Sequence, residues 1–107
     1  MSVKHVVMFG VLPETKVEEV EALKAGLLSL PKKIKQITSH EIGVDLQLEG
    51  GQNHPSGRNR DIVWSATFAS KEDYDVYEKH PEHVSVITDL IKPIMIPGSR
   101  SAIQYEI

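Results

Sequence analysis

Apolar residues follow a two-residue period in four short stretches of the chain. These stretches are rich in β-branched and aromatic residues and are bounded by glycine, proline and small polar residues, which is typical of β-strands. The first stretch is apolar on both alternating faces, so we expect something to cover each face of that strand. The four predicted strands are residues 3–11, 37–45, 61–69 and 101–107.

Apolar residues between the first two predicted strands instead recur at the three-and-four spacing of an amphipathic helix. Thr15 and Glu18 stand three residues apart ahead of this run, an arrangement that predicts a capping box at the helix start. Pro31 disfavours helical geometry in the residue before it. We therefore predict a helix that begins after Thr15 and ends before Pro31.

The second helical segment follows the third predicted strand and contains a break. Ser70 is a favourable N-cap, with Asp73 at the third position of the helix. The helix has to end or bend at His80, because the next residue is Pro81. Proline suits the first turn of a helix, so Pro81 predicts that a new helix begins directly after the break.

The resulting order of elements is β-α-β-β-α-β, with the second helix split. This order predicts an α+β protein with the ferredoxin-like fold, in which helices cover one face of a four-stranded antiparallel sheet. The other face would expose an apolar surface in a monomer, and such surfaces usually mark interfaces. We therefore expect a homodimer that packs sheet against sheet through Val6, Met8, Val63 and Ile103.

Composition narrows the possible partners and environment. A chain of 107 residues is the size of one domain, so we expect residues 1–107 to form a single domain. The net charge of −3 favours neither nucleic acid nor an anionic membrane as a partner. With no cysteine and no apolar run long enough to cross a bilayer, the chain is expected to be soluble and cytoplasmic.

The break between the two helical pieces gathers side chains that can carry chemistry. Tyr77, His80 and His83 lie within seven residues. A histidine can exchange a proton near neutral pH, and a tyrosine hydroxyl can stabilise a carbonyl oxygen that gains charge, so Tyr77 and His83 are the candidate catalytic pair. The structural alternative is that His80 caps the helix, His83 lies at the surface and Tyr77 is a core residue.

Other residues are candidates for lining a pocket between the sheet and the helices. His5 lies on an apolar strand face, where a polar side chain needs a partner, and it could be either a pocket residue or a satisfied core histidine. His40 could line the pocket or lie at the sheet edge, and Trp64 could line the pocket or fill the core. We predict a substrate-binding set of His5, Val7, Phe9, His40, Trp64 and His80.

No metal site is expected from the histidines. His80 and His83 are separated by a proline-containing turn and have no obvious carboxylate partner, and His5 is remote in the sequence. The zinc-protease motif is absent, and the segment Glu49-Gly50-Gly51 lacks the spacing of nucleotide-binding loops. We read residues 49–59, which are rich in glycine, proline and asparagine, as a polar loop.

Four segments together resemble the stress-responsive α/β-barrel (Dabb) family over nearly the whole chain. They are residues 3–7, Gly43, residues 66–70 and residues 77–83. The resemblance implies a dimeric α/β barrel that works without a cofactor. By similarity to a polyketide cyclase of this family, Tyr77 would bind a thioester carbonyl and His83 would be the general base. His5 and His80 would line or brace the pocket.

The chain also departs from that cyclase. Leu23, Ile62 and Trp64 replace pocket residues of different size or polarity, and Gln104 lies near a position where the family commonly has aspartate. A shared fold does not establish a shared substrate. Two functions therefore remain open. One is a cofactor-free cyclase or isomerase acting on a small apolar or polyketide-like molecule, and the other is a non-catalytic stress-response dimer with a structural or binding role.

Overall fold

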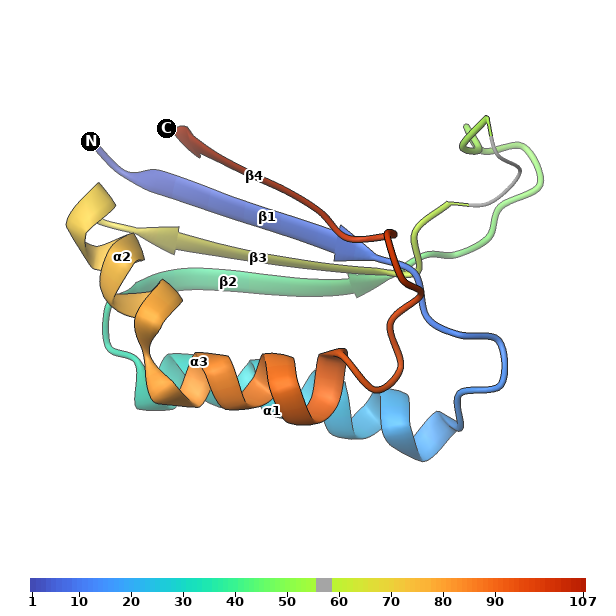
Figure 1. The fold of residues 1–107 in the computed structure, drawn as a ribbon. Coiled ribbons are helices and arrows are strands. Elements are labelled where there is room, and N and C mark those ends of the chain that lie inside the picture. Colours follow the sequence, from blue (N-terminus) through green and yellow to red (C-terminus); the bar gives the residue numbers. More distant parts are fainter. Residues whose placement is uncertain (56–58) are drawn as a thin grey trace.

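A computed structural model describes residues 1–55 and 59–107. Its centre is an antiparallel sheet, drawn as the upper layer of Figure 1, with helices beneath one face. This arrangement confirms the predicted ferredoxin-like fold. The strands, in their spatial order, are β2 (Ile37–Val44), β3 (Ile62–Phe68), β1 (Val3–Phe9) and β4 (Ser101–Glu106).

The helical layer consists of α1 (Val17–Lys33), α2 (Lys71–Lys79), α3 (Pro81–Val86) and the π-helical turn η1 (Ile87–Ile91). Helices α1 and α3 lie side by side under the sheet, whereas α2 lies at the end where both chain termini are found (Figure 1). None of the helices in the described part of the chain is long and apolar enough to cross a membrane.

The core lies between the sheet and the helices. Alternate residues of β1 and β3 face the helices, and the register places Val7 opposite Trp64 and Phe9 opposite Ile62. Helix α1 approaches η1 closely at Gly26, where an added Cβ would collide with the Leu90 side chain. The largest fully buried side chains are Phe9, Leu23, Leu30, Ile34, Trp64, Phe68 and Tyr77.

The start of α1 differs from the predicted capping box by one residue. Lys16 is the N-cap, and its backbone N–H donates to Glu19 Oε1 at 3.0 Å. The Thr15 N–H instead donates to the Leu12 carbonyl oxygen at 3.0 Å and closes a turn. The prediction of a box formed by Thr15 and Glu18 was therefore wrong, because this turn keeps Thr15 outside the helix.

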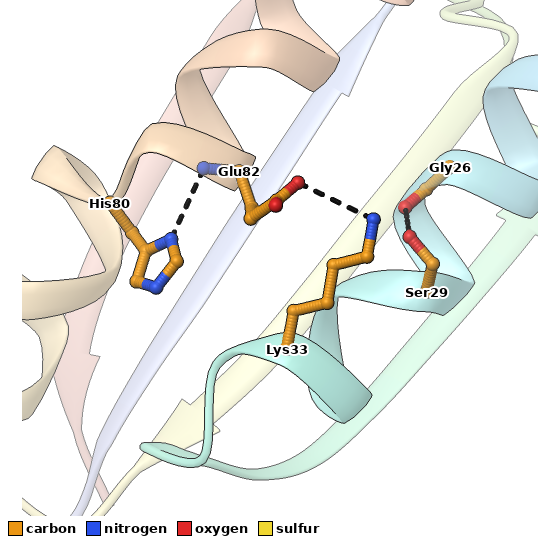
Figure 2. Close-up of polar contacts among 5 residues, drawn as sticks. All are labelled: Gly26, Ser29, Lys33, His80 and Glu82. Carbon is orange, nitrogen blue, oxygen red and sulfur yellow. Dashed lines mark hydrogen bonds and ion pairs between the residues drawn. The ribbon is translucent and has the colours of Figure 1, made fainter.

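The end of α1 also differs, because the helix continues through Pro31 to Lys33. Leu30 and Ile34 are both buried, and the Ile34 N–H donates to the Leu30 carbonyl at 2.7 Å. One turn earlier, the Ser29 hydroxyl donates to the Gly26 carbonyl (Figure 2). Burial of the two apolar side chains on either side of the proline outweighs the hydrogen bond that Pro31 cannot make.

The predicted break in the second helical segment is confirmed. The Asp73 N–H donates to Ser70 Oγ at 3.1 Å at the start of α2, and Pro81 opens α3. His80 both ends α2 and begins α3, since its Nδ1 accepts the Glu82 N–H at 3.1 Å (Figure 2). The Glu82 carboxylate also pairs with Lys33 Nζ at 3.3 Å, which ties α3 to α1.

The strands are slightly shorter than predicted at their ends. The largest difference is in β1, where the chain leaves the sheet after Phe9 and Val11 pairs with Met95 in an isolated bridge. We call residues 94–100 the C-terminal strap, because this segment returns along the end of β1 before β4 begins. Of the predicted polar loop 49–59, residues 56–58 lie outside the described residues.

Candidate active site

A cavity of about 380 Å³ lies between the helix-facing side of β1 and β3 and the segment α2-α3-η1. Its volume falls in the range of small-molecule pockets, and most of its lining is apolar or aromatic. The lining residues are His5, Val7, Phe9, Leu27, Trp64, Tyr74, Tyr77, Glu78, His83, Ile87, Ile91, Lys92, Met95 and Arg100.

A second hollow, of about 510 Å³, lies elsewhere, where the loop after β2 meets the opposite face of the sheet. Its lining includes Met8, Val63 and His54 but no tyrosine. The smaller cavity is therefore the one that brings several titratable rings together in an apolar setting, which makes it the better candidate for chemistry.

The cavity brings together most of the residues singled out in the sequence. Tyr77 and His83 both line it, as do four of the six predicted substrate-binding residues: His5, Val7, Phe9 and Trp64. His40 and His80 are not part of its lining.

Tyr77 is held at the centre of the site. It is only 1% exposed, and its hydroxyl oxygen accepts the Trp64 Nε1–H at 3.0 Å. Burial raises the pKa of Tyr77 to about 12, against the opposing effect of the hydrogen bond from Trp64. The phenol therefore keeps its proton at neutral pH. Because Trp64 uses only a lone pair of the oxygen, the O–H remains available to donate to a ligand.

His83 stacks directly on Tyr77, with ring centroids 4.1 Å apart and ring planes at 30°. Its Nδ1 lies 3.0 Å from the backbone carbonyl oxygen of Glu78. A carbonyl can only accept, so Nδ1 carries the proton and Nε2 of the neutral ring is bare. Burial lowers the pKa of His83, although the bond to the Glu78 carbonyl opposes this effect. At neutral pH the ring is thus an uncharged base.

His5 enters the site from β1 and lies opposite Gln104 of β4. Gln104 Nε2 lies 2.9 Å from His5 Nδ1 and donates to it, which leaves the ring proton on Nε2. Burial lowers the pKa of His5 to about 4, with smaller contributions from the charge of His83 in its protonated form and from that of Arg100. His5 is therefore a neutral hydrogen-bond donor in this arrangement, and aspartate in place of Gln104 would favour the opposite tautomer.

The two predicted substrate-binding histidines that lie outside the lining, His40 and His80, have different surroundings. His40 faces the helix side of the sheet, but it lies on the edge strand β2 and is exposed, with its ring 5.8 Å from that of Trp64. His80 uses Nδ1 to cap α3 (Figure 2). The position of His80 matches the capping alternative considered from the sequence, and that of His40 matches the edge alternative.

Three charged residues of the lining were not identified from the sequence. Glu78, Lys92 and Arg100 are exposed at the rim of the cavity. Glu78 lies within the segment that the sequence singled out, and one helical turn separates it from Tyr74. No local signal marks Lys92 or Arg100, because only the path of η1 and the C-terminal strap brings them to this cavity.

Metal ligation has no support in the arrangement of these side chains. Across residues 1–55 and 59–107, no group of three or more His, Cys, Asp or Glu side chains is placed to hold a metal ion.

The fold and the site define a ferredoxin-like α+β protein with a tyrosine–histidine cavity between its sheet and its helices. The sequence profile of the stress-responsive A/B barrel domain, Dabb, matches residues 3–107. The chain belongs to this family. No curated protein sequence matches the chain at a significant level.

Solved structures with the same fold cover nearly the whole chain. A dimeric ferredoxin-like protein of unknown function from Bacteroides fragilis is 26% identical, with a TM-score of 0.73 over 99% of this chain and 96% of its own. The Arabidopsis thaliana protein At3g17210 is 25% identical, with a TM-score of 0.78 over 98% and 94%. A hydroxynitrile lyase from Passiflora edulis is 16% identical, with a TM-score of 0.83 over 99% and 93%, and this likeness concerns the fold alone.

Proposed function

We propose that the cavity binds a small, largely apolar or polyketide-like molecule with a carbonyl group and acts on it by cofactor-free acid–base chemistry, as a cyclase or isomerase. The observation that carries the proposal is the stacked pair of Tyr77 and His83, whose rings lie 4.1 Å apart. Tyr77 offers an O–H donor for the carbonyl oxygen, and His83 offers a bare ring nitrogen as the base. Enolisation of a carbonyl compound requires these two groups.

In this mechanism the substrate carbonyl oxygen accepts a hydrogen bond from the Tyr77 hydroxyl. His83 Nε2 removes a proton from the adjacent carbon, and the C–H electron pair forms the enolate. In a cyclase the enolate carbon then attacks a second carbonyl carbon, which closes a ring and leaves an alkoxide. In an isomerase the enolate is instead protonated at an atom other than the carbon that lost its proton. The imidazolium of His83 returns its proton to the product, so that no external oxidant or reductant is needed.

Trp64 has a positioning role in the same proposal. It is 1% exposed, and its indole N–H holds the Tyr77 hydroxyl at 3.0 Å. A bulky indole in the cavity wall limits the length of the substrate, yet a cavity of about 380 Å³ remains beside it. The cavity should therefore accept compact substrates rather than long polyketides.

The direct test is exchange of α-protons of small aryl ketones for deuterium, followed by NMR with the whole chain. Wild type should accelerate exchange, whereas His83→Ala and Tyr77→Phe should each lower the enzyme-dependent rate by about 100-fold or more, in line with the usual contribution of acid–base groups. His40→Ala is the matched control, because His40 lies outside the cavity, and it should exchange at the wild-type rate.

The pH dependence of α-proton exchange is a second test of His83 as the base. Because burial lowers the pKa of His83, the base form should persist below the usual histidine range, and exchange should fall only as the pH drops through that lowered value. Exchange that is unchanged by His83→Ala would contradict the mechanism. Ligand binding with no exchange in wild type would instead favour the non-catalytic alternative, a stress-response protein that binds a small molecule.

We further propose that two copies of the chain pair through the sheet face that the helices leave open. Ile103 is 60% exposed and Met8 is 38% exposed on this face, and Val6 and Val63 lie beside them. The Bacteroides fragilis relative is described as dimeric, which supports the same assembly here.

A further inference from the structure

We propose that the cavity selects ligands that carry a carboxylate, which Arg100 binds at the rim with support from Lys92, while the apolar body of the ligand fills the interior. The inference rests on the proposed function, because it concerns the same cavity, and it adds the chemical class of the substrate. That class is a compact keto acid, with its ketone toward Tyr77.

The backbone on both sides of Arg100 is anchored. The buried Ser99 hydroxyl accepts the Gly10 N–H at 2.9 Å and donates to the Ile96 carbonyl at 2.6 Å. Arg60 Nε donates to the Ser99 carbonyl oxygen at 2.6 Å. On the other side, Ser101 begins β4 and pairs with Met8. The Arg100 side chain is therefore mounted on a fixed support, which reduces the entropy cost of holding a ligand.

The charge of Arg100 acts on the rings of the cavity, and none of the described side chains forms an ion pair with it. Its positive charge helps to lower the pKa of His5 and His83 and opposes the rise in the pKa of Tyr77, so it lies close enough to influence the rings of the cavity. Among the described residues, no carboxylate lies within ion-pairing distance of Arg100. A guanidinium without an internal partner at the rim of an apolar cavity is suited to a planar carboxylate.

Lys92 adds a second positive charge through the geometry of η1. In this π-helical turn the Lys92 N–H donates to the Ile87 carbonyl oxygen at 2.9 Å, and Ile87, Ile91 and Lys92 all line the cavity. Glu78 is the one carboxylate of the lining. Two cations and one anion leave the rim with an excess of one positive charge, although the whole chain has a net charge of −3. The cavity rim is thus locally opposite in sign to the protein.

The rest of the lining argues against a fully polar ligand. Val7, Phe9, Leu27 and Met95 surround the interior, so that a ligand with charges along its length would lose hydration without gaining partners. A single anionic group at the rim, attached to an apolar body inside, satisfies both parts of the cavity.

A matched pair of probes tests the inference. We choose 4-oxo-4-phenylbutanoate and its carboxamide, which have the same body and differ in charge, and NMR titration of the whole chain as the readout. Wild type should bind the carboxylate at least about tenfold more tightly than the carboxamide. Arg100→Gln should reduce this preference to about twofold or less, and Arg100→Lys should retain part of it. Lys16→Gln, which removes one positive charge outside the cavity, should keep the full preference.

The salt dependence of probe binding is an independent test of the charge interaction, and it requires no variant. The preference for the carboxylate should shrink between low and high sodium chloride, because the attraction at the exposed rim is screened, whereas carboxamide binding should change little. This measurement decides the question if Arg100→Gln proves unstable. Equal binding of both probes by wild type, or an undiminished preference in folded Arg100→Gln, would overturn the inference.

The same experiment separates this inference from the proposed function. His83→Ala should lose proton exchange but still prefer the carboxylate. Exchange that depends on His83, combined with equal binding of the two probes, would refute carboxylate selection alone. A clear preference for the carboxylate, with no exchange by wild type, would refute the catalytic proposal alone.

Discussion

Hydrogen-bond partners assign the ring protons of the two cavity histidines differently. The Glu78 carbonyl holds a proton on His83 Nδ1, whereas the Gln104 amide directs a donor to His5 Nδ1. One histidine consequently presents a bare nitrogen and the other an N–H. Two residues of the same type are thereby suited to opposite roles, a base and a donor, and neither role follows from the identity of histidine alone.

His5 should make the stability of the protein depend on pH. In the unfolded chain His5 takes up a proton below its usual pKa of 6.5, whereas in the folded protein it does so only near pH 4. The stability that the neutral ring contributes is therefore fully present above about pH 6.5 and is lost as the pH falls toward 4. The loss is on the order of 3 kcal/mol in the free energy of unfolding, at about 1.4 kcal/mol per pKa unit.

Urea unfolding at pH 7.5 and 4.5, at one protein concentration, measures this dependence. Carboxylates also titrate in this range, so the comparison is between variants. His5→Asn should lose clearly less stability on acidification than wild type, whereas His40→Asn, at an exposed position, should behave like wild type. Identical acid dependence of all three proteins would mean that His5 is not buried as a neutral ring.

At the scale of the elements, the junction between α2 and α3 determines how Tyr77 and His83 meet. His80 and Pro81 end one helix and begin the next within two residues. This turn lets Tyr77 of α2 and His83 of α3 stack, although six positions separate them in the sequence. In a continuous helix, residues six apart would lie on different faces.

His80→Ala should lower the free energy of unfolding by about 1 kcal/mol, because it removes the N-cap acceptor of α3. His80→Asn should retain most of the stability, since its amide oxygen can accept the same Glu82 N–H. Thermal and chemical denaturation, with His40→Ala as the control, would measure the difference. If the alanine and asparagine variants were equally stable, capping would not be the contribution of His80.

At the scale of the whole molecule, the exposed sheet face should determine the assembly. Ile103→Lys places a charge at the most exposed apolar position of that face that was identified from the sequence, and it should convert a dimer to a monomer in sedimentation velocity at micromolar concentration. Val76→Lys is the matched control, because Val76 is also exposed, at 45%, but lies on α2. A monomeric wild type under these conditions would refute the sheet-to-sheet dimer.

The sequence alone was sufficient to predict the order of elements, the sheet and the helix break, because these depend on periodicity and on the local chemistry of serine and proline. It was insufficient for α1, where burial of Leu30 and Ile34 overrode the local effect of Pro31. Helix propensity describes a residue in an isolated helix. The free energy gained by packing buried side chains can exceed the helix propensity of a single residue, and it did so here.

For the site, the sequence was enough to pair Tyr77 with His83, which lie in one short segment, and to name His5 and Trp64 as candidates for the pocket lining. The tertiary structure alone decided that His80 caps a helix while His83 enters the cavity, and that Arg100 joins them from the far end of the chain. The physical reason is that a cavity is bounded by segments distant in sequence. Its hydrogen bonds, burial and local charge arise only when those segments pack together.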